Sequence, residues 1–305
     1  MAKINVVAYA AAIPPNNTNL EKPLILQNFC EGVNLKNDTA LYHKSNNVLD
    51  CDLAILQGFV HEKGKTAPHL NLRKEVLNYQ TLRNKHTLIA DSNLFLYKNT
   101  KNPLHYLRYS FDGVFPTTGY YFTEKIDSSR WEKIKKNLNV TVEPWRSKGD
   151  HILICLQRNG GWSMQGTDSL HWLDSTINEI RQYSDRPIII RQHPGDKKTK
   201  VVTKYKNTFL SAKENLTEDL KNAWATITYN SSPGVASAIE GIPVFVLDPN
   251  YLNSQASDIA NTLIKNIENP MTPERDNWLK KISMCHWNFD ELKSGEAWEF
   301  IRQFV

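Results

Sequence analysis

The sequence is poor in the features that assign a function most directly. Its 305 residues include only four cysteines, which are scattered without a CxxC pair or a nearby set of histidines. Neither a zinc site nor a disulfide framework is therefore expected, and a reducing cytoplasm is the default compartment. No run of about 18 apolar residues occurs, which predicts that no segment spans a membrane. GxxxxGK[ST] and GxGxxG are also absent, which disfavours a P-loop nucleotidase and a Rossmann dehydrogenase.

Apolar segments of strand length alternate along the chain with polar stretches of helical character. Each apolar segment is short and apolar throughout, as in strands buried on both faces of a parallel sheet. The expected strands are residues 4–9, 53–57, 87–90, 151–156, 187–190, 225–229 and 243–247. Leu170, Leu173, Ile177 and Ile180 recur at helical spacing within residues 169–183, and a short helix is expected at 235–240 before Gly241. This alternation predicts an α/β fold with open parallel sheets.

The length of the chain fits two domains of about 150 residues each. A polar stretch with proline and glycine, EPWRSKGD at residues 143–150, separates a helix-like segment from a new strand. We therefore expect two Rossmann-like domains facing a cleft, formed by residues 1–148 and 149–287. A C-terminal helix at about residues 288–305 is expected to pack back on the first domain.

The net charge of +5 is concentrated in one stretch. Residues 61–108 contain nine lysines and arginines against three acidic residues, and six aromatic residues are interleaved or adjacent: Tyr79, Phe95, Tyr97, Tyr106, Tyr109 and Phe111. A basic face with aromatic side chains suits a polyanion such as nucleic acid. A solvated surface whose aromatic residues belong to the core is the alternative. On the first interpretation, the candidate contacts to such a ligand are Lys63, Lys65, Arg73 and Lys74.

Three polar loops in the second half each follow an expected strand. In open α/β sheets, ligands bind at the carboxyl ends of the strands, so these loops are candidates for a single site. The first loop lies in LQRNGGWSMQG at residues 156–166. Gln157 and Arg158 could reach a phosphate or a base there, and Gly160 and Gly161 would allow a ligand close to the backbone. An ordinary glycine turn is the alternative.

The other two loops carry a histidine and a pair of serines. RQHPGD at residues 191–196 projects Arg191 and His193 from a strand end, and lysines follow it; a solvated basic turn is the alternative. TYNSSPGVASAIEGIPVFV at residues 228–246 leads from a strand through Ser231 and Ser232 into a helix whose proline suits the first turn. A helix terminus of this kind favours a phosphate, although the serines could simply cap their own helix. Together the three loops predict a site for a nucleotide.

The HP pair at His193 and Pro194 and the SS pair at Ser231 and Ser232 resemble motifs of GT-B-type glycosyltransferases. Bacterial sialyltransferases and the capsule Kdo-transferase group share these motifs. GVASAIEGIPVFVLDP looks like the helix and strand that close a GT-B donor site, and the resemblance covers residues 152–249. More loosely, QRNGGWSM and DRPIIIRQHPGD are similar to stretches of phage-encoded glycosyltransferases.

The resemblance implies a UDP- or CMP-linked sugar donor in the second domain, with its phosphate held by the histidine and the serines. Gly234 and Glu240 then also belong to the donor side, and the first domain receives the acceptor. The chain departs from the sialyltransferase pattern at the acidic-acidic-Gly motif, because the matches FDG and CEG carry one acid each. Many GT-B enzymes carry a ribose-binding Glu at a position that corresponds to Ala236 in this chain.

Inverting sugar transfer needs a base for the acceptor hydroxyl, and two aspartates are candidates. Asp91 follows the expected strand at residues 87–90, and Asp112 belongs to the FDG match. Asp112 is slightly preferred because of that match, although each aspartate could instead be an ordinary turn or capping residue. No DxD motif follows an expected strand, which predicts a reaction without a metal ion or other cofactor.

The sequence as a whole predicts a cytoplasmic glycosyltransferase, located in the host cytoplasm if a phage encodes it. Its acceptor is expected to be a hydroxymethylated base in phage-type DNA, because of the basic stretch. A capsule or surface glycan is the alternative acceptor. A non-catalytic nucleotide-binding or nucleic-acid-binding α/β protein is the alternative function.

Overall fold

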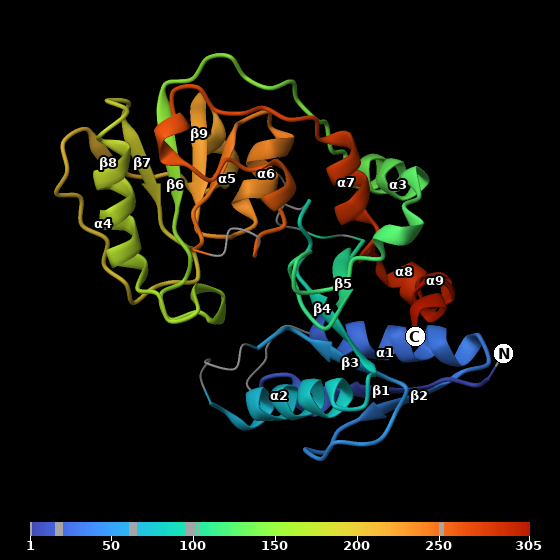
Figure 1. Cartoon of the computed structure of the whole chain (residues 1–305). Coiled ribbons are helices and arrows are strands. Elements are labelled where there is room, and N and C mark those ends of the chain that lie inside the picture. Colours follow the sequence, from blue (N-terminus) through green and yellow to red (C-terminus); the bar gives the residue numbers. More distant parts are fainter. Residues whose placement is uncertain (1, 16–20, 61–65, 96–101, 103, 250–252) are drawn as a thin grey trace.

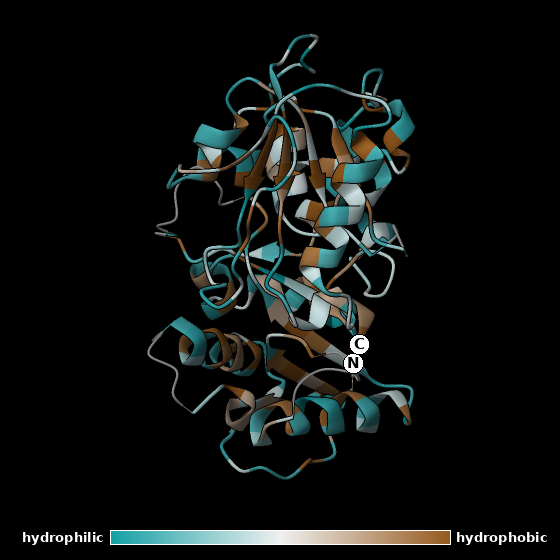
Figure 2. Ribbon diagram, turned by 90° about the vertical axis from the view of Figure 1, so that its left-hand side faces the viewer, coloured by the Kyte–Doolittle hydropathy of each residue, from teal (hydrophilic) through white to brown (hydrophobic). Residues whose placement is uncertain are grey.

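The computed structural model describes residues 2–15, 21–60, 66–95, 102, 104–249 and 253–305. These residues form two domains, each built around its own sheet (Figure 1). The central strands are largely apolar, and the helices that cover them carry polar residues outward (Figure 2). The α/β class and the two-domain arrangement expected from the sequence are confirmed.

The N-terminal domain contains a six-stranded sheet in the order β11-β5-β4-β3-β1-β2. Its strands are β1 (Asn5–Tyr9), β2 (Thr39–His43), β3 (Leu53–Gln57), β4 (His86–Asp91), β5 (Leu107–Phe111) and β11 (His286–Trp287). Strands β1 to β4 pair in parallel, whereas β5 runs antiparallel to both β4 and β11. The carboxyl end of β4 therefore lies beside the beginning of β5, with Asp91 opposite Arg108.

Helices α1 (Glu21–Leu35) and α2 (Pro68–Thr81) cover opposite faces of this sheet. Side chains alternate between the two faces along a strand, so Val6 packs in the cluster with α1 and Val7 packs in the cluster with α2. The same alternation in β3 sends Leu53 to the first cluster and Ala54 to the second. Burial on both faces explains why these strands appear in the sequence as continuous apolar runs.

The C-terminal domain contains a five-stranded parallel sheet in the order β10-β9-β6-β7-β8. Its strands are β6 (His151–Cys155), β7 (Ile188–Arg191), β8 (Thr208–Leu210), β9 (Ala223–Thr228) and β10 (Val244–Val246). Helix α4 (Ser169–Ile180) covers one face, where Leu173 and Ile177 join Ile152 and Ile154 in one cluster. Helices α5 (Leu216–Leu220) and α6 (Pro233–Ile239) contribute to the cluster on the other face.

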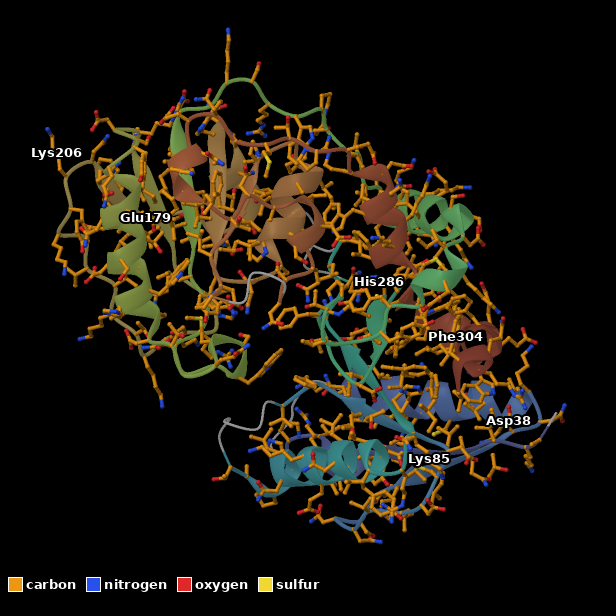
Figure 3. All side chains as sticks on the ribbon, in the orientation of Figure 1. Asp38, Lys85, Glu179, Lys206, His286 and Phe304 are labelled. Carbon is orange, nitrogen blue, oxygen red and sulfur yellow. The ribbon has the colours of Figure 1, made fainter. Side chains whose placement is uncertain are left out.

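The end of the chain returns to the N-terminal domain. Helix α7 (Asp276–Ser283) packs on α3 (Ser128–Leu138), β11 joins the first sheet, and α8 (Phe289–Lys293) and α9 (Glu296–Ile301) pack on α1. Arg130 and the buried Glu291 form a bidentate ion pair, with both N–O distances at 2.6 Å. Asp38, labelled in Figure 3, accepts hydrogen bonds from Trp298 Nε1 at 2.8 Å and Arg302 Nε at 2.6 Å. These buried polar contacts fix the C-terminal segment to the first domain.

Each of the seven strands expected from the sequence is present, with ends that differ by at most two residues. Four strands were not expected: β2 and β8 are sheet edges with exposed positions, β11 has two residues, and β5 carries an arginine. The segment that returns to the first domain also begins earlier than residue 288, because α7 and β11 already contact that domain. We therefore assign residues from α7 onward to the N-terminal domain.

Candidate functional site

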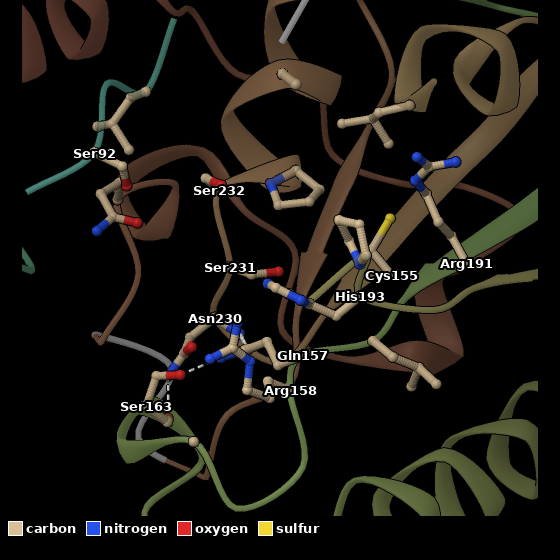
Figure 4. Close-up of a pocket in the computed structure, with 18 of the residues that line it drawn as sticks. Ser92, Cys155, Gln157, Arg158, Ser163, Arg191, His193, Asn230, Ser231 and Ser232 are labelled. Carbon is tan, nitrogen blue, oxygen red and sulfur yellow. Dashed lines mark hydrogen bonds between the residues drawn. The ribbon is translucent and has the colours of Figure 1, made fainter. Parts of the chain in front are cut away.

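A cavity of about 730 Å³ lies between the two domains, where the carboxyl ends of β6, β7 and β9 face the N-terminal domain. We call it the cleft pocket. Figure 4 shows residues that line it, with Ser92 from the N-terminal domain opposite Arg158, His193 and Ser231 from the C-terminal domain. Eight residues predicted from the sequence line this pocket: Asp91, Gln157, Arg158, Gly161, Arg191, His193, Ser231 and Ser232. The structure thus brings together one candidate base and the three candidate donor loops.

His193 presents a defined tautomer to the pocket. Its Nδ1 atom accepts a hydrogen bond from the Gly195 amide at 2.9 Å, so the hydrogen of the neutral ring resides on Nε2. Burial and the positive charge of Arg158 lower the pKa of His193 below its usual value. The ring is therefore neutral at physiological pH and can donate one hydrogen bond from Nε2.

The glycine in RQHPGD leaves room for Arg158 to lie close to the turn. A Cβ atom at Gly195 would lie 2.3 Å from Arg158 Nη2 and 3.1 Å from the His193 ring, so any side chain there would displace both groups. Asp196 then joins this turn to the first loop, because its Oδ2 accepts the Asn159 amide at 2.9 Å. The turn is thus part of the site and not an isolated surface feature.

Asp196 also organises the lysine-rich segment that follows it. Its carboxylate accepts hydrogen bonds from the Thr199 hydroxyl at 2.8 Å and the Thr199 amide at 3.1 Å. Desolvation raises the pKa of this carboxylate. The hydrogen bonds from Asn159 and Thr199 lower the pKa by more, and the net result is a pKa of about 2 for Asp196. The sequence reasoning missed this residue, although an acid directly after a His-Pro-Gly turn was a visible signal.

The first and third loops are connected by Gln157. Its Oε1 accepts the Asn230 amide at 2.9 Å, and its Nε2 donates to Ser163 Oγ at 2.7 Å. Asn230 Nδ2 donates in turn to the buried Asp248 carboxylate at 2.8 Å. Gln157 therefore positions the loops, whereas the sequence reasoning predicted it as a ligand contact. Ser163, Asn230 and Asp248 were not predicted.

Ser231 carries a hydroxyl that is available to a ligand. Its Oγ atom is buried and has no hydrogen-bond partner in the part of the chain that the structure describes. A buried hydroxyl without a partner is costly, and a ligand oxygen in the pocket would satisfy it. In Figure 4 the side chains of His193, Arg158 and Ser231 converge on the same space. Ser232 precedes α6 and makes no capping hydrogen bond with its side chain.

Arg191 is engaged within the protein. Its Nη1 lies 2.6 Å from the buried Asp219 carboxylate, and its guanidinium also donates to the carbonyl oxygens of Lys213 and Glu214. These contacts hold the segment 213–219 against the end of β7, where Glu214 and Leu216 line the pocket. Arg191 thus shapes the pocket wall, and its charge is largely compensated by Asp219.

The N-terminal domain places a carboxylate opposite these loops. Asp91 Oδ1 accepts the Ser92 amide at 2.7 Å, and Asp91 Oδ2 lies 3.3 Å from Arg108 Nη2. Arg108 is only 3% exposed, and among the described residues its Nε and Nη1 have no partner. Arg108 also lines the pocket and was not predicted as a site residue. The pair fixes the orientation of Asp91 toward the cleft.

Asp112 lies at the other end of the β4–β5 pair. Its Oδ2 is 2.6 Å from His86 Nδ1, and its Oδ1 accepts the Thr87 amide at 2.7 Å. It is therefore held beside the first residues of β4, whereas Asp91 ends that strand. The structure does not place Asp112 where a base in the cleft is needed, and its backbone φ of 61° fits a turn residue.

Three further predicted donor residues are not part of the described pocket wall. Gly160 is next to the lining residue Gly161, and Gly234 is buried inside α6 against Val244. Glu240 caps the far end of α6, away from the turn that faces the pocket. Their predicted contact with a donor stays untested.

The described part of the basic stretch does not form the exposed aromatic face that one interpretation required. Lys63 and Lys65 lie outside the described residues. Arg73 is 6% exposed, its Nε donates to the Ala12 carbonyl at 3.0 Å, and burial lowers its pKa to about 10. Lys74 is half-buried, and Lys85 lies before β4, away from the pocket (Figure 3).

The aromatic residues of this stretch belong to the core instead. Four of them are buried: Phe95, Tyr106, Tyr109 and Phe111. Tyr79 is half-buried under the Arg83 guanidinium, and Tyr97 lies outside the described residues. The structure thus corrects the polyanion interpretation for the residues it describes, in favour of the alternative that the aromatic side chains are structural.

The described residues contain neither a metal-binding cluster nor a helix that could cross a membrane. No group of three histidine, cysteine or acidic side chains in this part of the chain could hold a metal ion. No described helix is both long enough and apolar enough to cross a membrane.

Comparison with known proteins identifies the fold. No protein-family model and no curated protein matches the sequence. Among solved structures, the chain is similar to two forms of KpsC from Thermosulfurimonas dismutans. A β-Kdo 2,4 transferase is 12% identical, with a TM-score of 0.54 over 93% of this chain and 91% of that chain. A β-Kdo 2,7 transferase is 12% identical, with a TM-score of 0.55 over 99% and 100%.

The chain has the GT-B fold of these transferases. The fold implied by the HP and SS motifs is therefore confirmed, and the motifs lie at the pocket between the domains. At such low identity the likeness concerns the fold, so the activity has to be argued from the site. The looser resemblance to phage-encoded glycosyltransferases stays a prediction.

Proposed function

We propose that this GT-B protein is a glycosyltransferase that moves a sugar from a nucleotide-sugar donor to an acceptor hydroxyl. The observation that carries the proposal is the cleft pocket itself. Hydrogen-bond donors from three strand ends converge on one wall, and a carboxylate stands on the other wall. This is the distribution of charge that transfer between two bound partners requires.

His193, Ser231 and Arg158 are assigned to the phosphate of the donor. As the bond between the sugar and the phosphate breaks, negative charge increases on the departing nucleotide. The Nε2 hydrogen of His193, the Ser231 hydroxyl and the Arg158 guanidinium would stabilise that charge. These groups allow a reaction that needs no metal ion or cofactor. The donor is proposed to be a UDP- or CMP-linked sugar.

Asp91 is assigned as the base that takes the proton from the acceptor hydroxyl. It is the carboxylate that the N-terminal domain contributes to the pocket among the described residues, and Arg108 holds its orientation. With Asp91 in this role, the hydroxyl attacks the sugar from the side opposite the departing phosphate. The proposed reaction is therefore inverting.

A saccharide hydroxyl is the acceptor that we propose ahead of a hydroxymethylated base in DNA. The DNA hypothesis depended on an exposed basic face, and the described part of that stretch is largely buried or half-buried. The two solved structures of the same fold are Kdo transferases, and we propose a saccharide acceptor by analogy with them. A cytoplasmic location fits such an enzyme and remains a proposal.

The test is a screen of UDP- and CMP-linked sugars by thermal shift, followed by calorimetry with the sugars that bind. Turnover is then measured as release of the free nucleotide in the presence of saccharide and DNA acceptors. Binding with turnover supports the proposal, whereas binding without turnover on any acceptor would favour a nucleotide-binding protein. If no nucleotide sugar binds, the proposal is wrong.

A further inference from the structure

An aromatic side chain from the donor loop packs into the opposite domain. Trp162 begins a short 3₁₀ helix, Trp162–Met164, within the first loop of the C-terminal domain. Its ring centroid lies 5.1 Å from that of Phe59 in a T-shaped contact and 5.9 Å from that of Phe115. Both phenylalanines belong to the N-terminal domain, and Trp162 packs against the buried cluster that contains Val7 and Leu72.

The loop that carries Trp162 has backbone positions that tolerate rearrangement. Gly160 has a φ of 67° and Gly166 a φ of 88°, and a Cβ atom at either position would meet nothing within 4 Å. The loop therefore has open space at both glycines, whereas Met164 between them is buried in the core of the C-terminal domain. Yet Arg158, Gly161 and Ser163 of the same loop line the cleft pocket.

We propose that Trp162 is a positioning residue that couples the donor site to the acceptor-side domain. With its ring anchored between Phe59 and Phe115, it holds the donor loop so that Arg158 and Ser163 keep their places in the pocket. The inference rests on the proposed function, because the ligand whose binding reports it is a nucleotide. The proposal predicts that Phe59 contributes to nucleotide affinity. Phe59 lies in the other domain and is not part of the described pocket wall.

The coupling is measured with a double-mutant cycle. UDP and CMP are titrated by calorimetry into the wild type and into Trp162→Ala, Phe59→Ala and the double variant. An aromatic pair of this kind is expected to change affinity about 3- to 10-fold, so each single variant should raise the Kd by that factor. The double variant should lose no more than Trp162→Ala alone, because Phe59 acts through Trp162. Phe209→Ala, which removes an exposed ring from β8, is the matched control and should bind as the wild type does.

A second measurement does not need a ligand. Amide hydrogen exchange in residues 158–166 of the nucleotide-free protein should increase in Phe59→Ala, although those residues belong to the other domain. Trp162→Phe, which keeps a ring in the contact, should retain most of the protection. If Phe59→Ala fails to fold, Phe59→Leu replaces it, because leucine fills the site without a ring.

The outcomes separate the two hypotheses. A wild type that binds neither UDP nor CMP contradicts the proposed function, and exchange in the loop then decides the anchoring by itself. If the wild type binds nucleotide and Phe59→Ala has the same Kd, the proposed coupling is wrong. The glycosyltransferase proposal is unaffected by that result. Unchanged exchange in residues 158–166 of Phe59→Ala overturns the anchoring.

Discussion

Replacing His193 by alanine should weaken the binding of a nucleotide sugar without unfolding the protein. The Gly195 amide occupies Nδ1 of the ring, so Nε2 provides one hydrogen-bond donor to the pocket. The variant removes that donor and the ring that Arg158 packs beside. His193 is only half-buried and is not part of a hydrophobic cluster, so its loss should disturb folding little.

The size of the effect follows from the charge of the ligand. A hydrogen bond to a charged group contributes about 1.5–3 kcal/mol, which corresponds to roughly a 10- to 150-fold rise in the Kd. Calorimetry with the tightest-binding nucleotide sugar measures it. His171→Ala is the matched control, because His171 is an exposed histidine on α4. Ser231→Ala should weaken binding as well, because it removes the unpaired hydroxyl beside His193.

The pH dependence tests the protonation state of the ring. Burial and Arg158 lower the pKa of His193, so the imidazole should already be neutral at pH 7. Because a bound phosphate raises the pKa of the ring, affinity should rise as the pH falls through the bound-state pKa and level off only below the lowered pKa of the free protein. A rise that levels off above pH 7 would refute the lowered pKa, and an unchanged Kd in a folded His193→Ala variant would refute the role of the ring.

Four further outcomes are expected. Asp91→Asn should lower turnover by about 10²- to 10⁴-fold with donor affinity retained, whereas Asp112→Asn should leave turnover unchanged; equal losses in both variants would remove Asp91 as the base. Turnover should survive EDTA, and activity lost in chelator and restored by magnesium or manganese would contradict that. The folded-state pKa of Asp196 lies below its unfolded value, so its stabilisation is present above about pH 4 and disappears as the pH falls toward 2. Asp196→Asn should therefore lower the free energy of unfolding by roughly 1 kcal/mol in urea titrations at pH 7, after allowance for solvent screening, and a deficit that persists at pH 2 would be inconsistent with this origin. Duplex DNA should not bind at about 50 mM salt; binding with a log-linear salt slope near −0.9 per phosphate, flattened by Lys63→Ala and Lys74→Ala, would restore DNA as the acceptor.

The strands that the sequence predicted are those with short, continuous apolar runs. Seven strands lie inside their sheets or carry continuous apolar runs, and periodicity alone identifies such segments. The sequence did not predict β8. This strand has only three residues at the edge of the sheet, and the side chains of Phe209 and Leu210 are exposed. β5 was misread for the opposite reason, because a buried arginine in LRYSF made a core strand look like a basic surface.

The sequence predicted the location of the site, because the loops after parallel strands lie at the same edge of a sheet. Three loops follow three parallel strands, so the convergence of His193, Arg158 and Ser231 was deducible from sequence. Which of the polar residues face a ligand was not deducible. That depends on partners distant in the sequence, such as Asp219 beside Arg191 and Asn230 beside Gln157.

The choice between the two candidate bases shows where such reasoning fails. The sequence slightly favoured Asp112 because of the FDG match, yet the structure places only Asp91 in the cleft pocket. A residue that follows a strand reaches the ligand edge only if that strand runs parallel to its neighbours, and β5 runs antiparallel to β4. The reversal carries Asp112 back to the start of β4, where it accepts the Thr87 amide. The same reversal brings Arg108, at the beginning of β5, opposite Asp91. One antiparallel pairing thus removes the FDG aspartate from the pocket and supplies the arginine that orients the other aspartate.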